Sequence, residues 1–236
     1  MRKSGLSICE LLDALETFYG TQAPSWPVEP YEFIVWWHCG YPASDAACNK
    51  GWEKLRGEVG IGPQNLLEAA PRTLASALKA GGMVPELRAL RLKECAMRVK
   101  DAFGGDLGAA LAGPPQAARK TLQRFPGIAG PGADRILLFG GIAPIAAIPS
   151  NCPHVLPRIL YGREHKNYGA NYREAQQAIA AQVPETFDAR TRAYLLLKHH
   201  GQDICKRTKP KCEGCPVNSK CAFIHGRRPD GPGSGR

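Results

Sequence analysis

Apolar residues recur at helical spacing along most of the chain. In residues 7–19 and 86–103 they fall three or four positions apart, as on one face of a helix. Segments 170–182 and 188–200 have a similar pattern or a helix-forming composition. Residues 32–39 are apolar on every side, which is typical of a buried central helix. No Asn-Gly turn joins two alternating segments, so the pattern predicts an all-α fold.

Two of these segments have a defined apolar face. The first comprises Ile8, Leu11, Leu12, Leu15 and Phe18, and the second comprises Leu92, Cys95, Ala96, Val99, Ala102 and Phe103. Pro85 should begin the second helix and Gly104 should end it, because proline favours the first helical turn and glycine the position after the last.

Composition places the chain among globular proteins. It has 236 residues, 44% of them hydrophobic, which suffices for a substantial core. There is no run of 18 apolar residues, so we expect no membrane-spanning helix. We expect no signal peptide either, because Glu10, Asp13 and Glu16 interrupt the apolar positions of the first segment.

The charge and the cysteines narrow the class of protein. The net charge of +10 favours a polyanionic partner such as nucleic acid, since Lys and Arg neutralise phosphates, although a merely basic protein would have the same charge. The nine cysteines are an odd number, which argues for a reducing compartment and against a disulfide framework.

Four of the cysteines cluster near the end of the sequence. Cys205, Cys212, Cys215 and Cys221 are separated by six, two and five residues. Four thiolates within 17 residues can surround one metal centre, which leaves zinc or an iron–sulfur cluster as candidates. Only one close pair is present, and the longer arms suit the wider cubane better than a zinc ribbon.

This spacing resembles the cluster loop of endonuclease III and the related adenine glycosylases. The resemblance implies that the four cysteines bind a structural [4Fe–4S] cluster and that a basic loop meets the DNA backbone. The loop residues assigned to DNA binding are Lys206, Arg207, Lys209 and Lys211. Further basic residues are Lys220, Arg227 and Arg228. Between residues 205 and 228 the only acidic residue is Glu213.

A second motif, residues 122–136, is typical of a helix, a glycine-rich turn and a second helix. Its free backbone N–H groups at a helix N-terminus would form an anion site. It resembles the helix-hairpin-helix of the same superfamily, which implies phosphate contacts by Gly127, Ile128, Ala129, Gly130 and Gly132. Ala129 replaces the second glycine of the usual turn, and alanine would be strained there if the position needs a positive φ.

The resemblance covers roughly residues 5–225. It implies two helical domains with a DNA cleft between them. A six-helix barrel with the hairpin would span residues 28–144, and the cluster domain would combine residues 1–27 and 145–225. We expect residues 226–236 to form a disordered tail. The expected partner is double-stranded DNA, damaged or distorted, bound by a monomer in the cytoplasm, associated with the nucleoid.

The usual catalytic slots of these enzymes are altered. The resemblance implies a Schiff-base lysine at position 131 and an aspartate 18 residues later, but both slots hold proline, Pro131 and Pro149. Pro42 takes the place of a DNA-inserting glutamine, and His154 that of an arginine. Because proline has no titratable nitrogen and no N–H, the sequence predicts DNA recognition without standard glycosylase or lyase chemistry.

Two other functions stay open at this point. In the first, the chain is an active glycosylase with relocated groups, and Asp134 is the weak catalytic candidate because it lies near the helix face of the lysine slot. Lys120, Cys152, His154 and Tyr168 are the other ionisable candidates. In the second, the cluster makes the protein a DNA-binding redox regulator.

Overall fold

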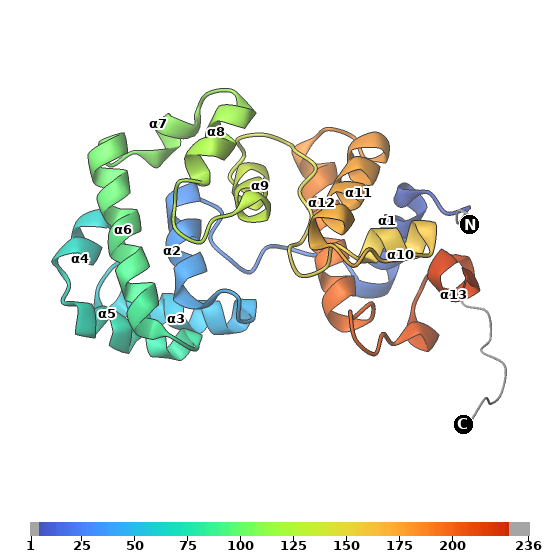
Figure 1. Cartoon of the computed structure of the whole chain (residues 1–236), viewed down its shortest axis with the longest axis horizontal. Helices are drawn as coiled ribbons and strands as arrows, with labels where there is room; N and C mark the ends of the chain where they lie inside the picture. Colours follow the sequence, from blue (N-terminus) through green and yellow to red (C-terminus); the bar gives the residue numbers. More distant parts are fainter. Residues whose placement is uncertain (1–4, 227–236) are drawn as a thin grey trace. The chain divides into compact units, whose positions relative to one another are not determined.

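The computed structural model describes residues 5–226, and these are helical along most of their length (Figure 1). Every regular element within this range is an α-helix or a 3-10 helix, which confirms the predicted all-α class. The chain divides into two compact units, one of Pro24–Ala143 and one of Met1–Ala23 with Pro144–Arg236. From the sequence we expected these boundaries after residues 27 and 144. The expected tail, apart from Gly226, lies outside the described residues.

The Pro24–Ala143 unit surrounds one buried helix. Its elements are α2 (Pro30–Gly40), α3 (Asp45–Glu58), α4 (Pro63–Glu68), α5 (Pro71–Leu78), η1 (Lys79–Gly81), α6 (Pro85–Phe103), α7 (Leu107–Leu111), α8 (Pro115–Leu122) and α9 (Gly130–Phe139). Helices α3, α6, α7 and α9 all pack against α2. Every α2 residue from Phe33 to Gly40 is buried, so the predicted central helix is confirmed. Pro30 begins it, and the Glu29 carboxylate accepts the Glu32 N–H at 2.7 Å.

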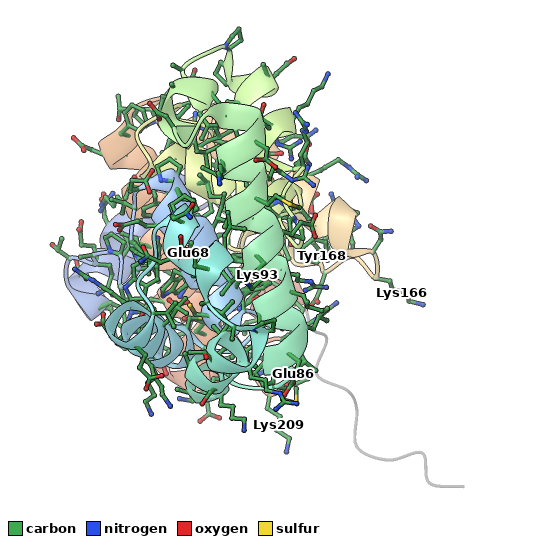
Figure 2. All side chains as sticks on the ribbon, turned by 90° about the vertical axis from the view of Figure 1, so that its left-hand side faces the viewer. Glu68, Glu86, Lys93, Lys166, Tyr168 and Lys209 are labelled. Carbon is green, nitrogen blue, oxygen red and sulfur yellow. The ribbon has the colours of Figure 1, made fainter. Side chains whose placement is uncertain are left out.

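Helix α6 is the long helix predicted at residues 86–103, and Figure 2 shows it in the foreground. Pro85 begins it and Gly104, at φ 59°, ends it, as expected. Lys93 reaches across to α4 and donates to the Leu67 carbonyl at 2.7 Å. The expected apolar face is wrong at its end, where Ala102 is exposed and Phe103 is only half-buried. Phe103 nonetheless stacks on the Phe125 ring, with centroids 6.2 Å apart.

A buried arginine joins three helix ends of this unit. The Arg88 guanidinium donates to the carbonyl oxygens of Cys39, Leu78 and Gly82. Gly81 packs so closely against the Cys39 carbonyl that a Cβ on Gly81 would overlap its oxygen. C-terminal helical carbonyls lack intrahelical donors and carry partial negative charge, so one cation stabilises several ends at once.

The other unit is built from both ends of the described chain. Its elements are α1 (Ile8–Tyr19), α10 (Val155–Tyr161), α11 (Tyr168–Gln182), α12 (Phe187–Asp203), η2 (Cys212–Gly214), η3 (Asn218–Lys220) and α13 (Ala222–Gly226). Helices α1, α11 and α12 confirm the three remaining predicted segments. Helix α1 starts with a Ser7–Glu10 capping box and packs on α11 and α12. Phe18, expected on its apolar face, is 52% exposed instead.

No helix among residues 5–226 is long and apolar enough to cross a membrane.

Candidate nucleic-acid interface and cluster loop

The hairpin motif forms α8, a turn over residues 123–129, and α9. Gly127 takes the left-handed conformation, with φ 72°, in which a side chain would be strained. Ala129 has φ −87° and ψ −178°, an extended conformation that any residue adopts. The alanine therefore causes no strain, because the only positive φ that this turn requires is at Gly127.

The N-terminus of α9 is open. No side chain caps it, and Pro131 at its second position has no N–H to be satisfied. Within residues 5–226, no hydrogen bond is formed by the N–H of Gly130 or of Gly132. Gly130 also makes room for the Arg119 side chain, which a Cβ at this position would overlap. A ten-residue helix with free first-turn N–H groups attracts anions.

Two side chains from distant helices contact the turn. His38 of α2 bonds to the Pro126 carbonyl, so its ring N–H is the donor. Burial, aided by the positive charge of Arg91, lowers the pKa of His38 to about 4. The Arg91 guanidinium of α6 lies 3.9 Å from where a Cβ on Gly127 would be. Among residues 5–226, no carboxylate pairs with Arg91, so an unpaired cation lies beside the turn.

The four clustered cysteines lie close enough to influence one another. Cys205 interacts electrostatically with Cys215 and Cys221, and Cys212 with the same two. Burial raises the pKa of Cys205 to about 12 and also raises the pKa of Cys215 and of Cys221. As free groups Cys205, Cys215 and Cys221 are thus neutral thiols, and a metal would be needed to hold them as thiolates.

Hydrogen-bond donors already point at three of the four sulfurs. The Val217 N–H faces Cys215, and the N–H groups of Phe223 and Ile224 face Cys221. Arg158 donates to Cys205. These donors suit thiolate sulfur, which accepts N–H bonds in iron–sulfur sites.

The described side chains do not converge on a single ion. In residues 5–226, no group of three or more His, Cys, Asp or Glu side chains has an arrangement that could hold a metal ion. A zinc site would require sulfurs about 2.3 Å from one shared point. In a cubane each cysteine binds a different iron, so its sulfurs lie farther apart. The donor chemistry of this loop fits the cluster, and the cluster itself stays a prediction.

Arg158 of α10 fixes the basic arm of the loop. It donates to the carbonyls of Lys206 and Arg207, each at 2.9 Å, and pairs with Glu164. His154 donates to the Cys205 carbonyl at 2.8 Å. The backbone that carries Lys206 and Arg207 is therefore held by two buried side chains, Arg158 of α10 and His154 at the N-cap of α10.

The basic side chains of the loop fall into two groups. Arg207 pairs with Glu164, Lys211 with Asp203 and Lys220 with Glu10, at 3.0, 3.2 and 3.4 Å. Glu213 is the only acid within residues 205–228, but acids from other elements also reach the basic side chains of the loop.

Lys206 and Lys209 are exposed, and neither has a partner within residues 5–226. Figure 2 shows Lys209 projecting from the surface. Arg227 and Arg228 lie outside the described residues. The described part of the loop thus offers two unpaired cations to a phosphate backbone.

Comparisons with known proteins give a consistent fold. No protein-family model matches the sequence, and no curated protein matches it. A solved endonuclease III trapped in a covalent intermediate with DNA is 17% identical, with a TM-score of 0.74, covering 93% of this chain and 96% of that one. A thermostable thymine-DNA glycosylase is 21% identical, with a TM-score of 0.72, covering 92% and 96%. A 3-methyladenine DNA glycosylase from H. pylori is 17% identical, with a TM-score of 0.58, covering 84% and 95%.

The chain has the endonuclease III-like fold. The resemblance noted from the cysteine spacing and the hairpin is thus confirmed at the level of fold.

The two proline slots occupy different settings in this endonuclease III-like fold. Pro131 is half-buried at the second position of α9, beside the open helix end. Pro149 is buried in the segment that leads to α10. Neither ring can accept, donate or attack, so neither position supports Schiff-base or carboxylate chemistry.

Asp134, the weak catalytic candidate, is held in an ion pair. Its side chain is 1% exposed, and the Arg119 Nε lies 2.5 Å from its Oδ1. Arg119 is on α8 and Asp134 on α9, so the pair joins the two helices of the hairpin. This geometry favours a structural role for Asp134.

The remaining ionisable candidates divide by burial. Cys152 is buried beneath α12, and burial raises its pKa to about 12. His154 is buried, and burial lowers its pKa. Lys120 is exposed on α8, and Tyr168, whose ring stacks on that of Tyr172, is half-exposed at the start of α11. Sequence reasoning missed Arg91 and His38, which meet the turn from positions more than 30 residues away and belong to no local motif.

Proposed function

We propose that this chain is a DNA-binding protein of base-excision repair that recognises damaged or distorted duplex DNA without standard glycosylase or lyase chemistry. One observation carries the proposal. The two slots that would hold the nucleophile and its acidic partner contain Pro131 and Pro149, and Asp134, the carboxylate three residues after Pro131, is already paired with Arg119.

Two surfaces support DNA binding, each within its own unit. At the hairpin, the open end of α9 and the unpaired Arg91 favour a phosphate. In the cluster loop, Lys206 and Lys209 are free to neutralise phosphates, and Arg158 holds the backbone that carries Lys206. A fixed backbone lowers the conformational entropy lost on binding.

The proposed cofactor is a [4Fe–4S] cluster bound by Cys205, Cys212, Cys215 and Cys221. The mutual electrostatic influence of these cysteines and the N–H donors around their sulfurs support it. The cluster would hold the loop together through four cysteine–iron bonds. These bonds would take the place of a hydrophobic core, which so short a segment lacks. Iron and acid-labile sulfide analysis of purified protein tests this directly, and stoichiometric zinc would refute it.

A cleavage and trapping assay tests the proposed function. Metal-analysed protein is incubated with duplexes that carry an abasic site, uracil, an oxidised pyrimidine, an 8-oxoguanine mismatch or an alkylated purine. Alkali reveals base release, and borohydride traps a Schiff base. Binding of a lesion duplex without release or trapping is the expected result. Base release that a point substitution on the protein abolishes would instead make it a glycosylase with relocated catalytic groups.

A further inference from the structure

Two polar contacts lead from α1 to one of the clustered cysteines. The hydroxyl oxygen of Tyr19 lies 3.0 Å from Nδ1 of His200. The other ring nitrogen of His200, Nε2, lies 3.7 Å from Sγ of Cys215. The His200 residue is 0% exposed, so both of its ring nitrogens lie inside the protein. A helix far away in sequence therefore reaches the loop through one imidazole.

The direction of these hydrogen bonds follows from the acceptor. A metal-bound thiolate has no proton, so the His200 Nε2 must donate to it. The neutral ring then has a bare Nδ1, which can only accept. Burial raises the pKa of Tyr19 well above its ordinary value, so its hydroxyl keeps its proton and is the donor. One tautomer thus satisfies every group in the series.

The neighbouring histidine has different contacts. His199 is exposed, its ring contacts the Tyr19 ring at a tilt of 30° with centroids 4.4 Å apart, and it bonds to the Gln22 oxygen at 2.8 Å. Among the described residues, no cysteine contacts its ring. The contact with sulfur is therefore specific to His200, and His199 provides a matched control on the same helix.

We propose that Tyr19 and His200 form a donor pair that directs a fixed N–H at the Cys215 thiolate and raises the reduction potential of the bound cluster. The inference rests on the cofactor proposed above. A hydrogen bond to a ligating sulfur withdraws electron density from the cluster. It therefore favours the reduced form, whose net charge is more negative. Neither residue ligates the metal, so both are positioning residues. Because Tyr19 belongs to α1, the reduction potential of the cluster would depend on how α1 packs.

The test measures the reduction potential of cluster-loaded protein by voltammetry, after iron and sulfide have been counted. The variants are His200→Leu, His200→Gln and Tyr19→Phe, and the control is His199→Leu. We expect His200→Leu to lower the potential most. Tyr19→Phe should lower it less, because the N–H remains but loses its polarising partner. His200→Gln should restore part of the shift, because the amide can donate to sulfur. His199→Leu should match the wild type.

Resonance Raman spectra of the iron–thiolate stretches give a second readout that simple loss of stability would not mimic. Should His200→Leu fail to fold, Tyr19→Phe and His200→Gln still decide the matter. Equal potentials and spectra in all loaded variants would overturn the donor pair and leave the proposed cofactor intact. Folded wild-type protein without iron and sulfide would overturn the cofactor and the donor pair together.

Discussion

The Arg119–Asp134 ion pair supports an asymmetric prediction about stability. Removing Arg119 leaves a nearly fully buried carboxylate without its cation, whereas removing the charge of Asp134 leaves an arginine that is 40% exposed and can be hydrated. Breaking a buried pair costs about 3–5 kcal/mol, and exposed pairs contribute about 0.2–1 kcal/mol. We therefore expect Arg119→Ala to destabilise the Pro24–Ala143 unit by about 3 kcal/mol and Asp134→Asn by about 1–2 kcal/mol.

Urea unfolding followed by tryptophan fluorescence measures this difference, because all four tryptophans lie in residues 26–52 of the same unit. The double variant Arg119→Ala, Asp134→Asn completes a mutant cycle that isolates the coupling energy. Lys120→Ala, at the exposed neighbouring position of α8, is the control and should change little. Equal stability of Arg119→Ala and wild type would refute the reasoning. So would an active enzyme in which Asp134→Asn abolished base release without loss of stability.

The remaining predictions concern His38, two lysines of the cluster loop, Arg91 and Cys212. Burial lowers the pKa of His38 to about 4 in the folded protein, whereas a histidine in the unfolded chain titrates near 6.5. The unfolded state therefore binds the proton first, and the free energy of unfolding decreases by up to about 3 kcal/mol as pH falls from about 6.5 to 4. His38→Gln should flatten that part of the pH profile of the urea midpoint, and an unchanged profile would contradict the assignment. Lys206→Ala should reduce the log–log salt slope of DNA binding by about 1. Lys211→Ala should change the slope less, because Lys211 is already paired with Asp203. Equal effects of the two substitutions would be inconsistent with this pairing. Arg91→Ala should weaken binding to every duplex alike and Arg91→Lys should restore part of it, as fluorescence anisotropy would show; loss for one sequence alone would exclude a phosphate contact. Cys212→Ser should abolish the brown colour and lower the thermal midpoint of the unit that holds the loop, and an equal midpoint would argue against coupling of the cluster to folding.

Local patterns predicted the helices well, because helical periodicity and caps depend on neighbouring residues. The pattern failed at Phe18 and Ala102, which have apolar spacing but are exposed, because burial depends on which helices pack against each turn. Several glycines near the turn could have taken the positive φ, and their spacing could not show that Gly127 does so.

Charge pairing was less predictable than the helices, because it depends on tertiary contacts. Counting charges between residues 205 and 228 found Glu213 alone. The acids that pair with the loop come from positions 10, 164 and 203. The same limit applies to Arg91 and His38, which become neighbours of the hairpin turn only when α2 and α6 pack together.

One unit is built from two segments that lie far apart in the sequence, and this affects the order in which parts of the chain can fold. Helix α1 needs α11 and α12 to bury its apolar face, and these lie about 150 residues or more farther along the chain. During synthesis residues 24–143 are complete first and can fold on their own local contacts, while α1 waits with its leucines uncovered. Contacts of such long sequence separation close slowly. A nascent chain stalled before α12 would therefore expose an amphipathic helix to chaperones, and metal loading would be among the last events of maturation.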